Sequence, residues 1–259
     1  MNNRHLPLAL SMLAFSIMML LAYFGLVTYF DFPNILRQQS TTMLQTFNES
    51  QNKIIFFYYL FVLSQIILIG VVLQLKSFLS NIDSMLLTVS TGFGVLAGFA
   101  QAIGFLRWPF VTPFFSSVIS NPDLSIAQKE SALIVFEAFH RFSGVAVGEN
   151  LFFVLESVWI LTLGLFLLKQ RLLSITMSSI PIVSGILILV YSLEQFGGIF
   201  TVLAPLNVIA HGAIVFWFIA LAKMLLQYGT FGASLSVGRL SSALIISTYL
   251  SIVVPSLFS

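Results

Sequence analysis

Long apolar stretches without charged side chains constrain this chain more than any other feature of its sequence. Only 8% of its 259 residues are charged, against roughly a quarter in soluble domains. A helix needs roughly 20 apolar residues to cross the hydrocarbon core of a membrane. Stretches of sufficient length cover residues 6–30, 54–75, 85–106, 145–168, 172–193, 199–225 and 240–258. Of these, 145–168 contains Glu149 and Glu156, and 199–225 contains Lys223 near its end. The sequence therefore predicts an all-α, polytopic transmembrane helical bundle of about seven spans, forming a single integral membrane domain over residues 1–259.

Composition narrows the classes of function. The 11 Lys and Arg residues against 9 Asp and Glu give a formal charge of +2, and they are scattered among apolar stretches, so nucleic acid is not an expected partner. The absence of Cys excludes disulfides, thiolate metal sites and cysteine nucleophiles. Membrane lipid is the partner that the composition does imply, while no cofactor is implied and the oligomeric state is left open.

The distribution of basic residues predicts the orientation. Lys and Arg favour short cytoplasmic loops. With the N-terminus inside, the inner segments are short and carry Arg4, Lys76, Lys169, Arg171, Lys223 and Arg239. The outer segments are longer and carry Arg37, Lys53, Arg107, Lys129 and Arg141. We therefore expect a cytoplasmic N-terminus.

Two outer segments, 34–51 and 107–143, are predicted to hold amphipathic helices. In the first, apolar residues recur at helical spacing, which suggests a short helix on the membrane surface. The second begins with aromatic residues around Pro109 and Pro113, and these prolines argue against a continuous helix there. Ser125 is a suitable N-cap for a helix through Phe142, and this helix can run on into the span that begins near Val145.

Polar residues within the predicted spans gather in the outer half of the membrane. Under the predicted orientation, depth follows from the 1.5 Å rise per residue of a helix. Ionisable groups inside a membrane are costly and usually functional. The set predicts a polar cavity open to the outer side, with Gln101, Arg107, Glu149, Glu156, Asn207 and His211 as its ligand-binding residues.

Each of these residues also has a structural interpretation. Arg107 and Trp108 end a span, so a snorkelling cation beside an interfacial indole would explain them without a ligand. Glu149 and Glu156 are seven residues apart and share a face if the span is α-helical, where a protonated Glu could bond a neighbouring helix. His211 lies among small residues and could bond across a helix interface.

Pairs of glycines within the predicted helices indicate places where two helices pack closely. Gly94 and Gly98, and likewise Gly144 and Gly148, are spaced at i and i+4 and are interpreted first as packing seams.

A metal site is the alternative interpretation of the ionisable residues. Glu137 and His140 are three residues apart, a spacing found in dinuclear sites of helical bundles, but the chain has only one copy. A metal would then use Glu137, His140, Glu149 and His211. Glu137 also lies four residues before Arg141, which favours an ion pair.

Two stretches, GFLRWPF at 104–110 and VFEAFHRFSGVAVGEN at 135–150, resemble a bacterial multi-pass membrane family known as a domain of unknown function, of the DUF4386 type. The similarity would cover most of residues 6–225. It implies a location in the bacterial cytoplasmic (inner) membrane, but no activity, substrate or cofactor.

These observations predict a multi-pass membrane protein that binds a small or amphiphilic ligand in an outward-facing intramembrane cavity, as a sensor or carrier. A membrane-embedded metal-dependent enzyme using His140, His211 and Glu residues is one alternative, and a structural or assembly subunit is another. No nucleophile motif, phosphate loop or dinucleotide fingerprint is present, so the sequence leans against an enzyme.

Overall fold

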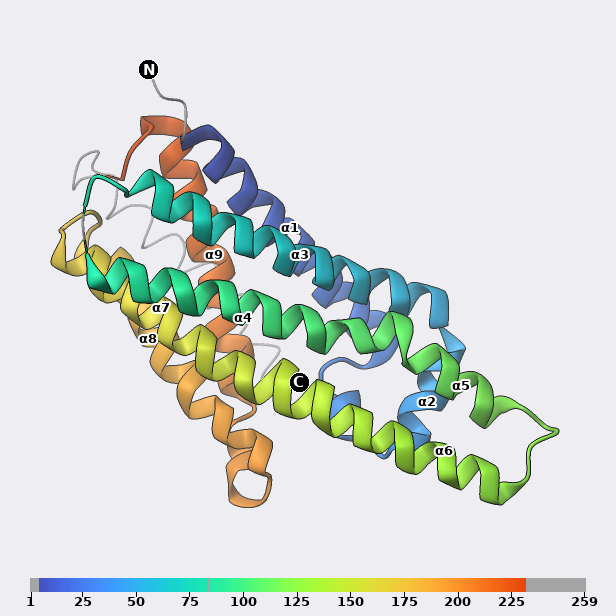
Figure 1. Ribbon diagram of the computed structural model, residues 1–259. Helices are drawn as coiled ribbons and strands as arrows, with labels where there is room; N and C mark the ends of the chain where they lie inside the picture. The colour runs from blue at the N-terminus through green and yellow to red at the C-terminus, as the bar shows by residue number, and fades with distance from the viewer. Residues whose placement is uncertain (1–4, 83, 232–259) are drawn as a thin grey trace. The chain divides into compact units, whose positions relative to one another are not determined.

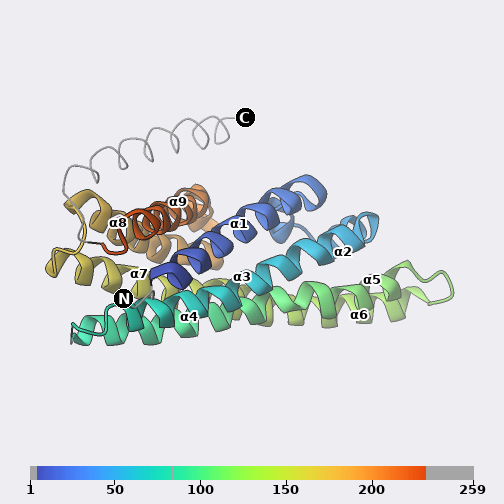
Figure 2. The ribbon, with the colours of Figure 1, turned by 90° about the horizontal axis from the view of Figure 1, so that it is seen from above.

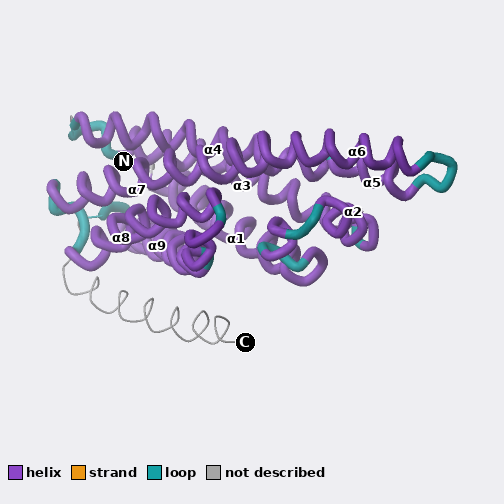
Figure 3. Tube along the Cα trace, turned by 90° about the horizontal axis from the view of Figure 1, so that it is seen from below, coloured by secondary structure: helices purple, strands orange, loops and turns teal. Residues whose placement is uncertain are grey.

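The computed structural model describes residues 5–82 and 84–231, and every regular element in them is a helix (Figures 1 and 3). The all-α prediction is therefore confirmed. The predicted span at 240–258 lies outside the described residues. The main helices are α1 (His5–Phe30), α2 (Ser40–Glu49), α3 (Gln51–Phe78), α4 (Met85–Phe110), α5 (Thr112–Ser120), α6 (Ile126–Phe139), α7 (Phe152–Lys169), α8 (Ile175–Tyr191) and α9 (Pro205–Tyr228).

Within the described residues, six helical stretches are long and apolar enough to cross a membrane. They correspond to the predicted spans other than 240–258, and several extend well beyond them. The chain is thus a multi-pass helical membrane protein. The candidate spans are His5–Phe30, Gln51–Phe78, Met85–Ser120, Ile126–Lys169, Ile175–Phe196 and Gly198–Tyr228.

The chain divides into two compact units, each of which includes parts of the long helices. Unit 1 contains Met1–Ser16, Ile67–Gly98 and Asn150–Ser259, and unit 2 contains Ile17–Ile66 and Phe99–Glu149.

Unit 1 includes three consecutive helices, α7, α8 and α9, which Figure 2 shows from above. The middle helix, α8, packs against both of the others. Trp217 of α9 is fully buried, and its indole N–H donates to the carbonyl oxygen of Met177 in α8 at 2.8 Å. Gly185 lets α8 approach α7 closely, because an added Cβ would lie 3.0 Å from the carbonyl oxygen of Ser157. Small residues and an indole hydrogen bond thus hold these helices together.

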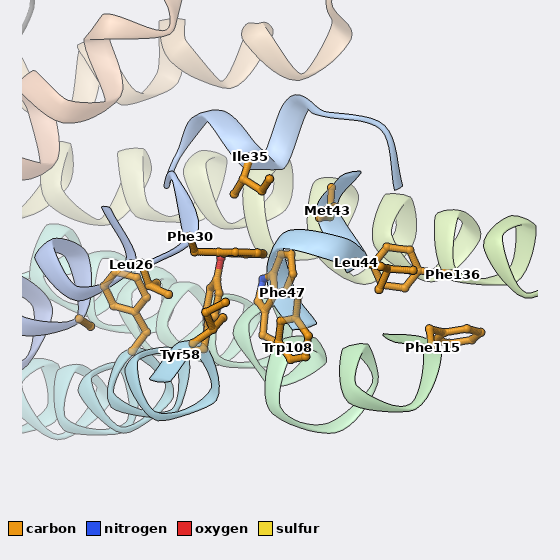
Figure 4. Close-up of a cluster of buried hydrophobic side chains, with 13 residues drawn as sticks. Leu26, Phe30, Ile35, Met43, Leu44, Phe47, Tyr58, Trp108, Phe115 and Phe136 are labelled. Carbon is orange, nitrogen blue, oxygen red and sulfur yellow. The ribbon is translucent and has the colours of Figure 1, made fainter. Parts of the chain in front are cut away.

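Unit 2 encloses an aromatic core, shown in Figure 4. Its helices α2, α5 and α6 contact one another, and α5 and α6 lie side by side as a hairpin (Figure 1). The core also receives side chains from α1, α3 and α4. Its fully buried aromatic members are Phe30, Phe47, Tyr58, Trp108 and Phe136.

The segment 34–51, predicted to be amphipathic, forms a short 3-10 helix (Asn34–Arg37) followed by α2. Its amphipathic pattern is confirmed, since Ile35, Met43, Leu44 and Phe47 are all buried. A position on the membrane surface stays a prediction for this helix, but its apolar face packs against protein. Those side chains belong to the aromatic core of unit 2, so protein rather than lipid covers them.

The segment 107–143 differs from the prediction at its prolines. Helix α4 continues through Pro109 to Phe110, and the interruption falls at Val111, with Pro113 in the first turn of α5. A proline at the start of a helix removes only an N–H that has no partner there. The prolines therefore predicted correctly that the helix is interrupted in this segment. The interruption lies at Val111 and not at Pro109.

The predicted N-cap at Ser125 is confirmed. The Ser125 hydroxyl accepts from the Gln128 backbone N–H, and the Gln128 side chain accepts from the Ser125 backbone N–H, which is a capping box. After α6 the chain continues without a break through a π-helix (His140–Leu151) into α7. The expectation that this amphipathic helix runs on into the next span is thus confirmed.

Candidate functional site

The π-helix His140–Leu151 is the element around which the polar residues of unit 2 gather. It carries His140 near its start and Glu149 near its end, and both are buried. π-Helical turns are rare, and they are frequent at functional sites. The unit 2 residues around this π-helix are therefore a candidate functional site.

Glycines allow α4 to approach the π-helix closely. A Cβ on Gly104 would collide with the Cα of Gly148, so the two backbones are in direct contact. A Cβ on Gly144 would lie 2.5 Å from the Arg107 guanidinium carbon, so Gly144 makes room for that side chain. Within unit 1, a Cβ added to Gly94 would likewise lie 2.8 Å from the indole of Trp159. The packing-seam interpretation of Gly94, Gly144 and Gly148 is confirmed.

The glycine contact gives a stability prediction. We expect Gly104→Ala to destabilise the protein by about 1–2 kcal/mol, because the added Cβ meets the backbone of Gly148, which cannot rotate away as a flexible side chain could. Gly92→Ala in the same helix is the matched control, since nothing lies within 4 Å of its added Cβ. Thermal denaturation in detergent micelles measures both. Equal denaturation midpoints for the two variants would contradict the expected seam.

Arg107 is buried inside unit 2, with 6% of its surface exposed. Its Nη1 donates to the carbonyl oxygen of Gly104 at 2.8 Å, and its guanidinium carbon lies 5.0 Å from the centre of the Trp108 ring. A snorkelling arginine would expose its charged end, and an interfacial indole would expose its ring, whereas Trp108 is 1% exposed. Both side chains instead belong to the interior of the unit.

Aromatic rings pack around Trp108, the neighbour of this arginine. Trp108 stacks on Tyr58, with ring centres 4.8 Å apart and an interplanar angle of 12°, and it meets the Phe30 ring edge-on at 4.9 Å. The His140 ring lies 6.3 Å from Trp108 and stacks on Phe136 at 6.0 Å. Figure 4 shows Tyr58, Trp108 and Phe30 together at the centre of the cluster.

Two polar contacts join residues 37 and 40 to the π-helix and to α6, respectively. Arg37 donates from Nη2 to Glu149 Oε2 at 2.8 Å, and the Ser40 hydroxyl donates to Glu137 Oε2. Glu137 also accepts from Arg141 Nε at 2.7 Å, so the predicted i,i+4 pair is confirmed. The Arg37–Glu149 contact joins positions 112 residues apart, and the sequence pattern did not indicate it.

Four of these buried side chains have a polar atom without a hydrogen-bond partner among the described residues. The atoms are Tyr58 Oη, Arg107 Nε, His140 Nδ1 and Glu149 Oε1. They belong to one electrostatic group, since Arg107 interacts with Tyr58 and Glu149, and His140 interacts with Arg107. Gln101 Oε1, also in unit 2, is a further buried acceptor without a partner among the described residues. We call Tyr58, Arg107, His140 and Glu149 the unit 2 polar cluster.

Unit 1 contains the other predicted residues, in a second polar group. His211 Nε2 lies 2.8 Å from Glu156 Oε2, and His211 Nδ1 lies 2.9 Å from the carbonyl oxygen of Asn207. The Asn207 side chain donates to the Tyr191 hydroxyl at 3.2 Å. The structure thus brings together Glu156, Asn207 and His211, as the sequence suggested, and adds Tyr191.

The predicted site residues are therefore distributed over both units. Gln101, Arg107 and Glu149 belong to unit 2, and Glu156, Asn207 and His211 to unit 1. The shared face of Glu149 and Glu156 was inferred from α-helical spacing, whereas α-helical geometry begins only at Phe152. Sequence reasoning missed Tyr58, because a tyrosine within an apolar, aromatic-rich stretch carries no distinguishing signal.

The metal alternative finds no support in the geometry. Within residues 5–82 and 84–231, no three His, Asp or Glu side chains form a group that could hold a metal ion. The four suggested ligands, Glu137, His140, Glu149 and His211, instead take part in the separate contacts described above.

The helices and their buried polar groups define a multi-pass helical membrane protein. The model of a family described as a domain of unknown function (DUF4386) matches residues 8–229, most of the chain. The chain belongs to this family, which confirms the resemblance of its two characteristic stretches. No curated protein and no solved structure matches the chain.

Proposed function

We propose that this protein binds a small polar or amphiphilic ligand through the unit 2 polar cluster, as a sensor or carrier in the bacterial cytoplasmic membrane. The observation that carries the proposal is the set of four buried polar atoms without a partner among the described residues. Each unsatisfied buried donor or acceptor costs about 1–3 kcal/mol. Such a concentration of unmet hydrogen bonds in one cluster is explained by a bound group that satisfies them.

The atoms define the chemistry of the expected ligand. Arg107 Nε can only donate, an ionised Glu149 oxygen can only accept, and the Tyr58 hydroxyl can do either. The Nδ1 of a neutral His140 accepts, because the other ring nitrogen donates to the backbone of Leu36. A ligand group that both donates and accepts, such as a hydroxyl or an amide, matches this set. Arg37 and Arg107 together outweigh the charge of Glu149, which also favours an anionic group nearby.

Helix lengths support an amphiphilic ligand at the membrane interface. The stretch Ile126–Lys169 has 44 residues, or about 66 Å of helix, and the hydrocarbon core is about 30 Å thick. A crossing of about 20 residues counted back from Lys169 ends near Glu149. A crossing of the same length from Met85 ends close to Arg107. Both charges would then lie at the level of lipid headgroups, on the outer side if the N-terminus is cytoplasmic.

Native mass spectrometry of the purified protein tests the proposal. We expect wild-type protein to retain a defined small molecule or lipid species, and Glu149→Gln to lose at least tenfold in its occupancy, because the carboxylate acceptor is replaced. Glu130→Gln is the matched control, since Glu130 lies on α6 outside the unit 2 polar cluster. If water molecules alone satisfied the polar atoms of the cluster, the spectrum would show no retained small molecule or lipid. That result, or equal retention in both variants, would contradict the proposal.

A further inference from the structure

The hydrogen bonds of His211 fix the number of protons on its ring and on Glu156. The Asn207 carbonyl oxygen, 2.9 Å from Nδ1, can only accept, so Nδ1 must carry a proton. The contact of 2.8 Å between Nε2 and Glu156 Oε2 needs a second proton, because two lone pairs would otherwise face each other. The Glu156–His211 pair therefore holds two of these protons. A neutral imidazole beside an ionised carboxylate would hold only one.

We infer that Glu156 and His211 form a proton-binding site within the membrane-spanning part of unit 1. The bound proton lies on either Nε2 or Oε2, which gives an ion pair or a neutral pair. In both forms the net charge is zero, which suits a buried site where an uncompensated charge is costly. Glu156 is 4% exposed, and rings of Phe152 and Phe153 flank the imidazole, with centres at 6.2 and 5.7 Å.

Few other charges act on this pair. The electrostatic partner of His211 is Glu156 on α7, and its remaining polar neighbour is the Asn207 backbone. Helix α8, which packs against α7 and α9, contributes the titratable Tyr191 through Asn207, and the 3-10 helix that follows it contributes Glu194. Lys169 ends α7, while Lys223 and Tyr228 lie in the last part of α9.

The proton links the helices on which the pair lies. Glu156 belongs to α7 and His211 to α9, and the chain of hydrogen bonds continues through Asn207 to Tyr191 at the end of α8. Loss of the proton breaks the Glu156–His211 hydrogen bond and leaves a net negative charge among apolar side chains. Proton release therefore favours separation of the two side chains and entry of water between α7 and α9.

Spectroscopy of the full-length protein in lipid nanodiscs tests the proton count at neutral pH. Nitrogen NMR of labelled histidine reports an imidazolium at His211, and difference infrared spectroscopy reports a protonated buried carboxyl at Glu156. We expect one of these two signals in the wild type. It should disappear in Glu156→Gln, whose amide N–H can bond Nε2 without a titrating proton. Glu194→Gln, which changes another buried carboxylate of unit 1, should retain it.

Two results would overturn the inference. One is the absence of both signals in the wild type, a measurement that needs no variant to fold. The other is a signal that persists unchanged in Glu156→Gln.

Alkaline stability gives an independent readout. The stabilising contact is present while the proton is bound and is lost as pH rises through its release. We expect the wild-type melting temperature to fall by several degrees at high pH, together with loss of the spectroscopic signal. Glu194→Gln should show the same fall, and Glu156→Gln should lack it. An identical alkaline fall in Glu156→Gln would contradict a proton-dependent contact.

Discussion

Trp108→Ala is expected to destabilise the protein by about 3–5 kcal/mol, the range found for deleting a buried aromatic side chain. Trp108 is 1% exposed and contacts rings from separate segments of unit 2, including Phe30, Phe47 and Tyr58. Truncation to Ala removes all of these contacts and leaves a cavity that rigid helices cannot close. Thermal denaturation of the purified protein in detergent micelles measures the loss.

Phe110→Ala is the matched control for this variant. Phe110 lies two residues further along α4, but 68% of its surface is exposed in the isolated chain. Removal of such a side chain usually changes stability by less than about 0.5 kcal/mol. If Trp108→Ala unfolds no more readily than Phe110→Ala, the indole lies at an interface, as the sequence first suggested, and not within the core of unit 2.

Local signals predicted much of the fold. Hydropathy identified the spans because a helix crossing a membrane must be apolar over a length fixed by the bilayer. Ser125 marked the start of α6 because a capping hydroxyl acts within one helical turn. The periodicity of residues 34–51 identified an amphipathic helix, but not what its apolar face contacts. Lipid and an aromatic core select the same side chains, so the sequence could not distinguish them.

The candidate site depended more on tertiary packing. Arg37 was interpreted only as a topology signal, because its partner Glu149 is 112 residues away. The π-helix at His140–Leu151 has no signature in the sequence spacing, and its close contact with α4 at Gly104 and Gly148 is seen only in the structure. Glu156 and His211 were foreseen as one polar set because ionisable groups inside a span need partners. Their direct contact, 55 positions apart, could only come from the structure.

Arg37→Ala is expected to destabilise the protein by about 2 kcal/mol, because buried Glu149 loses its ion-pair partner and keeps only the electrostatic interaction with Arg107. Glu149 Oε1 already has no hydrogen-bond partner among the described residues, and Oε2 loses its contact with Arg37 at 2.8 Å. The value is below the roughly 3–5 kcal/mol typical of a fully buried pair, because 39% of the Arg37 side chain is exposed to solvent screening.

A matched pair of arginines makes this prediction specific. Arg141→Ala removes the partner of Glu137 from a pair whose side chains are 76% and 39% exposed, and should cost only about 0.3 kcal/mol. The double variant Arg37→Ala, Glu149→Gln should recover part of the loss, since a neutral amide is less costly to bury than an unpaired carboxylate. Chemical denaturation of the wild type and these variants, with Glu149→Gln alone, measures the coupling energy. Equal losses for Arg37→Ala and Arg141→Ala would show that Glu149 is solvated, and the unit 2 polar cluster would then have no need of a ligand.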